Sequence, residues 1–227
     1  NGLIYVCSSH GLFTVSDPFK QAKKIISSKI VIDILEYKKD VFWVVTDSGI
    51  LLVNAFGETI KQYQTIVDSN GKEVSLIFNT SCIYKAQDGS TWFGTKKSGL
   101  YYYNDSKDLF VPVQFDHQSN ALEVNIVRTI NEDKIGNLWI GTESGLFVYN
   151  RRNNTLKNYD HNSEAHGGKL SDKAIYSIYQ SKENIMWVGT YFGGVNIMRP
   201  WEKGFHSLLV EDDGTGLSGK AVSEIIQ

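Results

Sequence analysis

The sequence predicts an all-β fold of repeated four-stranded antiparallel sheets, and three observations support this class. The 227 residues include 20 Gly, 12 Tyr, 11 Phe and 5 Trp but only 3 Pro. Four of the 5 Trp recur at intervals of 49, 47 and 48 residues. Short apolar runs separated by tight turns surround each of them. Four strands in a unit of about 47 residues is the pattern of a β-propeller blade.

The second strand of each unit carries the tryptophan. These residues are Trp43, Trp92, Trp139 and Trp187, and Tyr5 takes the same position in the first unit. We expect the large ring to fill the wedge between neighbouring twisted sheets. A glycine two residues later should let the next blade approach closely. Three units have this glycine, at Gly94, Gly141 and Gly189.

The third strand of each unit opens with a glycine six or seven residues after the tryptophan. These glycines are Gly49, Gly99, Gly145 and Gly193, with Gly11 in the first unit. The spacing predicts short hairpins in which glycine supplies a positive φ. A Val-x-x-Ile-like run before each tryptophan predicts the inner strand, and more polar segments such as Leu109–Asp116 and Leu156–Asp160 predict the outer strand.

The repeat divides the chain into units 1–29, 30–78, 79–124, 125–173 and 174–220, while 221–227 begins or closes a blade. Two arrangements fit a chain that begins with a tryptophan-type strand and ends with an inner strand. Either 221–227 pairs with Leu3–Ser8 and closes a five-bladed ring, or five consecutive units are part of a larger ring. Because the chain starts at Asn1 without a signal peptide, we expect it to be a piece of a longer protein.

Charge and cysteine content exclude several classes. The net charge of −2 gives no general electrostatic reason to bind nucleic acid or a membrane surface. No stretch approaches the roughly 18–20 apolar residues of a spanning helix, so we expect no membrane segment. Cys7 and Cys82 lie far apart in the repeat order. We expect two unpaired buried thiols rather than a disulfide.

A specific motif appears in the fourth unit. Residues Asp133–Asn150 read DKIGNLWIGTESGLFVYN. This segment resembles the two-component regulator propeller repeat, approximately D-x-x-G-N-L-W-I-G-T-x-x-G-L-x-x-Y-N. Residues Val188–Arg199 match well, and Asp88–Asn104 matches with one extra turn residue. The first two units diverge after the tryptophan position, but the resemblance extends over essentially the whole chain.

The resemblance implies a non-catalytic sensor region of a membrane-bound histidine kinase, often of the hybrid type found in Bacteroidetes. Such regions form propellers, usually seven-bladed, in the periplasm and respond to oligosaccharides from glycan breakdown. The implied partners are the remaining blades, downstream receptor domains and a second receptor copy in a homodimer. No cofactor is implied.

The repeat motif is a scaffold motif, so candidate ligand residues come from geometry. In a propeller, the turns between second and third strands share one face with the loops that lead into the next inner strand. Tyr191 and Phe192 replace a polar Glu-Ser pair in one such turn, and Lys96 and Lys97 lie in another. Aromatic rings beside amide and charged groups suit sugars. The alternative is that Tyr191 and Phe192 pack on the neighbouring blade.

A metal site is also conceivable but disfavoured. His161 and His166 lie in a polar loop beside Asp160 and Glu164. They lack ligand spacing on a regular element, so we expect a solvated loop and no metal. Both histidines are nevertheless candidate ligand-binding residues, together with Tyr191, Phe192, Lys96 and Lys97. The segment Asp68–Glu73 resembles a calcium loop only faintly, and a tight turn explains it more simply.

Two other functions remain open from the sequence. One is a protein-interaction propeller without a small ligand. The other is a sialidase-like carbohydrate-active enzyme, because Asp88–Trp92 is one residue short of an Asp-box. Only Arg128 among the four Arg lies on a predicted inner strand, and no pair of catalytic carboxylates is evident. The sequence therefore favours a non-catalytic sensor over an enzyme.

Overall fold

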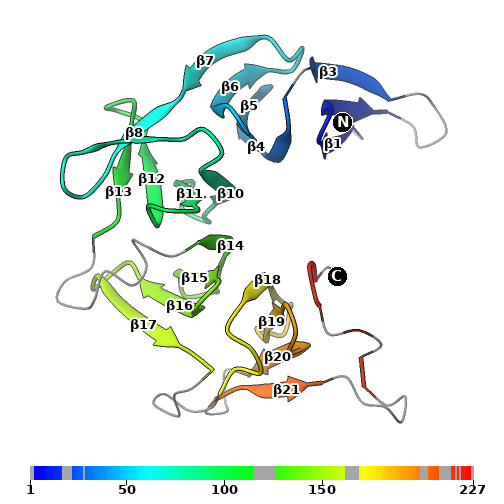
Figure 1. Cartoon of the computed structure of the whole chain (residues 1–227), viewed down its shortest axis with the longest axis vertical. Coiled ribbons are helices and arrows are strands. Elements are labelled where there is room, and N and C mark those ends of the chain that lie inside the picture. Colours follow the sequence, from blue (N-terminus) through cyan, green and yellow to red (C-terminus); the bar gives the residue numbers. More distant parts are fainter. Residues whose placement is uncertain are drawn as a thin grey trace. The chain divides into compact units, whose positions relative to one another are not determined.

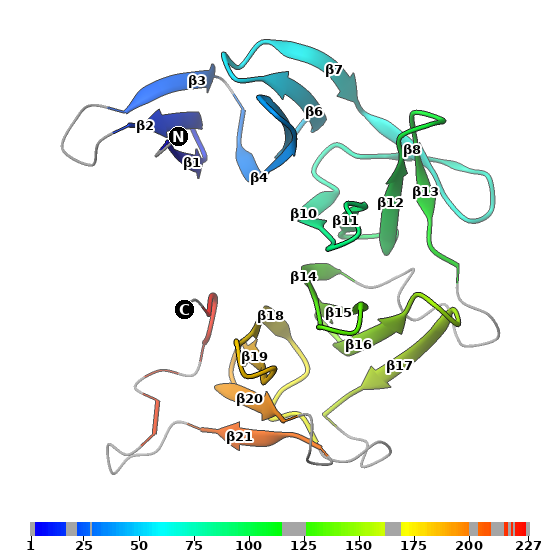
Figure 2. The same cartoon turned by 180° about the vertical axis from the view of Figure 1, so that it is seen from behind.

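The computed structural model describes residues 3–16, 22–27, 29–114, 126–161, 169–199, 204–209, 216–217, 219 and 221–225, and these residues are all-β. Five sheets correspond to the five repeat units, and in each sheet every strand pairs antiparallel with its sequence neighbours (Figure 1, Figure 2). In four of the five sheets this order confirms the predicted blade of inner, tryptophan, glycine and outer strands. Among the described residues the first sheet has three strands and lacks the inner one. Among the described residues, no helix has the length and apolar character needed to cross a membrane.

The strand bounds follow the repeat. The first sheet contains β1 (Ile4–Ser8), β2 (Gly11–Val15) and β3 (Lys23–Ser27). The second contains β4 (Val31–Lys38), β5 (Val41–Thr46), β6 (Gly49–Asn54) and β7 (Thr59–Tyr63). The third contains β10 (Thr80–Lys85), β11 (Thr91–Thr95), β12 (Leu100–Asn104) and β13 (Leu109–Pro112). The fourth contains β14 (Val127–Glu132), β15 (Asn137–Thr142), β16 (Gly145–Asn150) and β17 (Thr155–Tyr159). The fifth contains β18 (Ile175–Gln180), β19 (Met186–Thr190), β20 (Val195–Met198) and β21 (His206–Leu208).

A small hairpin interrupts the loop between the second and third sheets. Its strands are β8 (Thr65–Val67) and β9 (Glu73–Ser75). The Asp68 carboxylate accepts the backbone N–H groups of Asn70 and Lys72, and Gly71 has a φ of 79°. The segment Asp68–Glu73 therefore forms a tight turn, as predicted.

The chain divides into two compact units. The first comprises Asn1–Lys85, Gly89–Thr95 and Tyr101–Val113, and the second comprises Ala86–Asp88, Lys96–Leu100 and Gln114–Gln227. The first three sheets therefore lie mainly in the first unit, and the last two lie in the second.

Threonine and glycine close the turns between tryptophan and glycine strands. The buried Thr142 hydroxyl donates to the Gly145 carbonyl oxygen at 2.8 Å. Gly145 has a φ of 136°, and a Cβ there would lie 2.7 Å from the carbonyl oxygen of Tyr159. Only glycine fits this position. In the fifth sheet the turn is one residue longer, and Gly194 rather than Gly193 accepts the corresponding threonine bond.

The glycine after the tryptophan admits the next inner strand. A Cβ at Gly141 would lie 2.7 Å from Cγ2 of Ile175. At Gly189 a Cβ would lie 2.7 Å from Cγ1 of Val222, whose N–H donates to the Thr190 carbonyl oxygen at 2.8 Å. These spacings confirm the predicted close approach. They also place Val222 where a further inner strand would begin.

Within the first compact unit, Trp43 of the second sheet fills the space between the second and third sheets. We call this space the filled wedge. Trp43 is fully buried there. Ring centroids lie 4.9–6.1 Å from the Trp43 centroid for five residues, namely Tyr37, Tyr63, Phe93, Tyr103 and Phe110. This packing confirms the structural role predicted for the repeated tryptophan.

Both cysteines are free thiols, as predicted, but only Cys82 is buried, whereas Cys7 is partly exposed. Burial, with a smaller contribution from the carboxylate of Asp33, raises the pKa of Cys7 to about 11 and that of Cys82 to about 12. Both thiols therefore stay protonated at neutral pH, which makes them poor nucleophiles.

A buried ion pair joins turns within the second unit. The Arg151 guanidinium donates to the carboxylates of Glu132 and Asp88 and, through Nε, to the carbonyl oxygen of Gly136 at 3.0 Å. Glu132 is only 2% exposed and also accepts the backbone N–H of Gln87 at 2.6 Å. This network satisfies a carboxylate that water does not reach.

Candidate ligand-binding site

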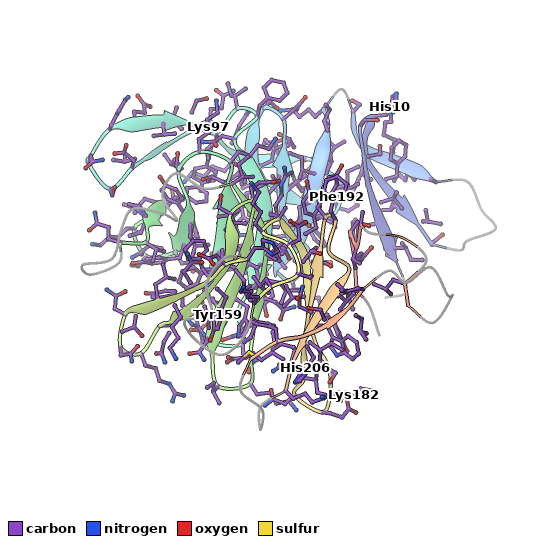
Figure 3. All side chains as sticks on the ribbon, turned by 60° about the horizontal axis from the view of Figure 1, so that its bottom comes forward. His10, Lys97, Tyr159, Lys182, Phe192 and His206 are labelled. Carbon is purple, nitrogen blue, oxygen red and sulfur yellow. The ribbon has the colours of Figure 1, made fainter. Side chains whose placement is uncertain are left out.

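The turn between β19 and β20 holds two aromatic side chains toward solvent. Tyr191 is 40% exposed and Phe192 is 65% exposed. Phe192 is labelled in Figure 3. The Thr190 hydroxyl donates to the Gly194 carbonyl oxygen at 2.9 Å and accepts the N–H of Gly193 at 2.9 Å. Because the turn is closed from inside by these bonds, the residues between them project outward.

The exposed rings continue into a stack on the inner strand. Tyr191 stacks on Tyr176 of β18, with centroids 5.0 Å apart and planes 25° apart. Phe192 meets the edge of Tyr191 at a centroid distance of 4.2 Å, and its N–H donates to Asp172 at 2.8 Å. Tyr191 therefore packs within its own sheet, and Phe192 is left accessible.

A charge pair from the fourth sheet borders this stack. The guanidinium carbon of Arg128 lies 5.0 Å from the Tyr176 ring centroid. Arg128 Nε donates to the Glu143 carboxylate at 2.6 Å, and the Tyr176 hydroxyl donates to the same oxygen at 3.3 Å. Burial raises the pKa of the Tyr176 phenol; Arg128 opposes this shift and Glu143 adds to it. We call these five residues, Arg128, Glu143, Tyr176, Tyr191 and Phe192, the aromatic-arginine surface.

This surface offers two kinds of contact at once. Its exposed rings present apolar faces, and the paired Arg128 and Glu143 present polar groups with no net charge. Such a combination suits an uncharged ligand that has C–H faces and hydroxyl edges. The Glu143 carboxylate is already engaged by Arg128 and Tyr176, so its role here is to hold the arginine in place.

The other predicted site residues lie elsewhere. Lys96 and Lys97 lie in the turn between β11 and β12 of the third sheet, whereas the aromatic-arginine surface draws its side chains from the fourth and fifth sheets. His161 Nδ1 lies 2.8 Å from the carbonyl oxygen of Leu170, which holds this ring locally. His166 lies outside the described residues. Within the described ranges, no group of three His, Cys, Asp or Glu could hold a metal ion.

Arg128, Glu143 and Tyr176 were not among the predicted site residues. The repeat contains a signal for them, because Arg128 and Tyr176 occupy the same second position of successive inner strands. Glu143 and Tyr191 likewise each follow the turn threonine in successive units. Superposing the units would have placed all four side chains at one edge of two adjacent sheets.

Comparison with a family model finds two repeats in the chain. Residues 121–144 and 169–192 match the two component regulator propeller model. This match confirms the resemblance of the fourth and fifth units. A curated histidine kinase from Formosa agariphila is 30% identical over 149 residues, which is 65% of this chain and 11% of that protein. The chain thus spans about a tenth of the length of this relative.

Solved propellers share the fold. The extracellular domain of a hybrid two component system from B. thetaiotaomicron superposes with a TM-score of 0.71 at 23% identity, covering 100% of this chain and 29% of that one. A surface component of the type-IX secretion system of Porphyromonas gingivalis gives 0.66 at 14% identity, covering 100% and 36%. The WD40 β-propeller domain of Doa1 gives 0.60 at 12% identity, covering 87% and 60%. These similarities confirm a propeller architecture.

Proposed function

We propose that this chain is a ligand-sensing propeller segment of a two-component receptor, located in the periplasm, and that the aromatic-arginine surface binds neutral oligosaccharides. The observation that carries the proposal is the exposed Phe192 ring, which lies edge-on to the stacked Tyr191 and Tyr176, beside a neutralised Arg128–Glu143 pair. The matching repeats and the extracellular domain from a hybrid two component system support the receptor context.

Binding at this surface would act on the receptor through differential affinity. A ligand shifts an equilibrium between two receptor arrangements only by the difference in its affinity for them. The aromatic-arginine surface draws side chains from two sheets, with Arg128 and Glu143 on the fourth and Tyr176 and Tyr191 on the fifth. A ligand that contacts both sheets would therefore favour one arrangement of the blades. In a receptor homodimer, that preference would pass to the histidine kinase, while this segment itself performs no catalysis.

Calorimetric titration of the 227-residue chain with a panel of neutral oligosaccharides tests the proposal. We expect saturable binding that Phe192→Ala weakens roughly three- to ten-fold, as expected for loss of one stacking contact. Phe56→Ala is the matched control, because Phe56 is 77% exposed and lies in the first unit.

The same samples separate the alternatives. Chromatography of the sugars after long incubation should show no new product. Product formation would overturn the sensor proposal in favour of an enzyme, and the absence of binding to every sugar would favour a protein-interaction propeller.

A further inference from the structure

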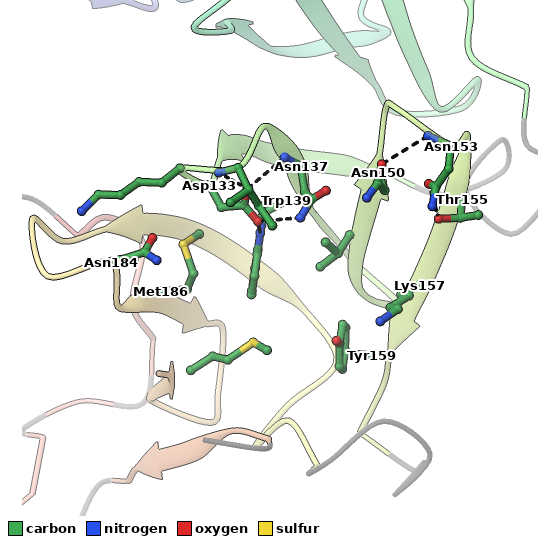
Figure 4. A pocket seen from close by; sticks show the side chains of 14 residues that line it. Asp133, Asn137, Trp139, Asn150, Asn153, Thr155, Lys157, Tyr159, Asn184 and Met186 are labelled. Carbon is green, nitrogen blue, oxygen red and sulfur yellow. Dashed lines mark hydrogen bonds between the residues drawn. The ribbon is translucent and has the colours of Figure 1, made fainter. Parts of the chain in front are cut away.

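A hollow of about 500 Å³ lies between the fourth and fifth sheets, within the second unit (Figure 4). Its apolar walls include Trp139, Val148, Met186 and Met198, and Tyr159 also lines it. Its charged lining residues are Asp133, Lys134 and Lys157. This volume is in the range of small-molecule sites. We call this space the hollow wedge.

The hollow wedge corresponds to the filled wedge of the first unit. In each sheet the repeated tryptophan lies on the second strand, and the strand register places Lys157 opposite Val148 just as it places Lys61 opposite Leu52. Trp139 thus takes the position of Trp43. One chain therefore contains the same wedge twice. Phe205 packs edge-on against Trp139 at a centroid distance of 6.5 Å, but a hollow remains beside the tryptophan.

Two ring substitutions explain the open space. Tyr103 is the fourth residue of β12, and Met198 is the fourth residue of β20. Phe93 is the third residue of β11, and its counterpart in β19 is Val188. In the filled wedge these two rings lie 4.9 and 5.6 Å from the tryptophan centroid. The smaller side chains of the fifth sheet leave that volume unfilled.

The hollow wedge also differs in charge. In the filled wedge the Asp108 carboxylate accepts the hydroxyls of Tyr63 at 2.5 Å and Tyr103 at 2.6 Å, and it pairs with Lys61. Lys157 has no ion-pair partner in the part of the chain that the structure describes.

We propose that the hollow wedge binds a small aromatic carboxylate. Its ring would occupy the volume that Tyr103 fills in the other wedge, against Trp139 and the two methionines. Its carboxylate would pair with Lys157, which also lines the hollow. Methionine sulfur contacts aromatic rings favourably, and a carboxylate forms charge-assisted hydrogen bonds with lysine. This site is separate from the aromatic-arginine surface and does not depend on the oligosaccharide proposal.

Titration with phenylacetate and indole-3-acetate, followed by calorimetry on the 227-residue chain, tests the charge requirement. We expect saturable binding of both acids and roughly ten-fold weaker binding of the neutral phenylacetamide. Lys157→Gln should abolish this preference for the acid. Lys61→Gln, at the corresponding position of the filled wedge, should leave it unchanged. Equal binding of acid and amide, or no saturable binding, overturns the proposal.

A second variant tests the position of the ring. Met198→Tyr installs the side chain that closes the other wedge and should reduce acid binding at least ten-fold, whereas Met198→Leu should retain it. Unchanged binding to Met198→Tyr overturns the proposal. Should circular dichroism show that Met198→Tyr is poorly folded, the Lys157 comparison decides alone, since that side chain is exposed. Oligosaccharide binding is expected to be unaffected by either variant, so the two proposals fail separately.

Discussion

Replacing Arg151 with methionine removes the cation from the buried network of the second unit. Methionine retains an unbranched apolar stem, so the change mainly deletes three hydrogen bonds. The carboxylate of Glu132 stays in place at 2% exposure and keeps only the N–H of Gln87 as a partner among the bonds described for it. The variant therefore measures the cost of an uncompensated buried charge.

The expected size follows from the exposure of each partner. Breaking a buried pair by removing one member typically costs about 3–5 kcal/mol. The Asp88 side chain is 57% exposed, so its contact with Arg151 contributes little. Because the Gln87 N–H still stabilises Glu132, we expect the low end, about 3 kcal/mol. In a chain of this size, that loss lowers the unfolding midpoint by roughly 6–12 °C.

Thermal and urea unfolding, monitored by circular dichroism, measure the effect. Arg152→Met is the matched control, since Arg152 is the exposed neighbour in the same turn, and it should change stability by less than about 0.5 kcal/mol. Adding Glu132→Gln to Arg151→Met should recover most of the loss because the unpaired charge disappears. The reasoning fails if Arg151→Met is as stable as Arg152→Met, or if the double variant is no better than the single one.

Three further predictions concern the repeat scaffold. Gly141→Ala should destabilise the second compact unit by about 1–3 kcal/mol in urea unfolding, because its Cβ would lie 2.7 Å from Ile175. An unchanged stability would contradict the close approach. Thr142→Val should cost about 1–3 kcal/mol in the same assay, since it leaves a buried turn carbonyl without its hydroxyl donor, and Thr142→Ser should restore most of the stability. Cys7 and Cys82 ionise at higher pH in the folded chain than in the unfolded chain, so stability should fall as pH rises above about 9, where only the unfolded thiols lose protons. Cys82→Ala should flatten that decline, and an unchanged slope would contradict the raised thiol pKa values.

The repeat pattern was enough to predict the blade order because each position has one geometric demand. A tryptophan such as Trp43 or Trp139 occurs where a wedge between sheets has to be filled. A glycine such as Gly141 or Gly189 occurs where a neighbouring side chain would collide with a Cβ. These demands recur in sequence, so aligning the units recovers them.

The site was only half predictable. Tyr191 and Phe192 stood out because they replace polar turn residues. Arg128 and Tyr176 did not, since each looks like an ordinary inner-strand residue until two adjacent sheets are placed side by side. The hollow wedge was invisible for a different reason. It arises because Val188 and Met198 take positions that aromatic rings occupy in the filled wedge. The absence of those rings can be recognised only by comparison with the packed wedge.

The packing of each inner strand against the glycine that follows the tryptophan position in the preceding sheet affects how the blades fold. Gly141 receives Ile175 of the fifth sheet, and Gly189 receives Val222 of the following segment. Each of these glycine positions is therefore covered only when the next inner strand is folded against it. This coupling between neighbouring sheets should make the blades unfold in groups rather than singly. Deleting residues 216–227 would remove Val222 from its contact with Gly189. We expect amide hydrogen exchange to accelerate first in β18 and β19.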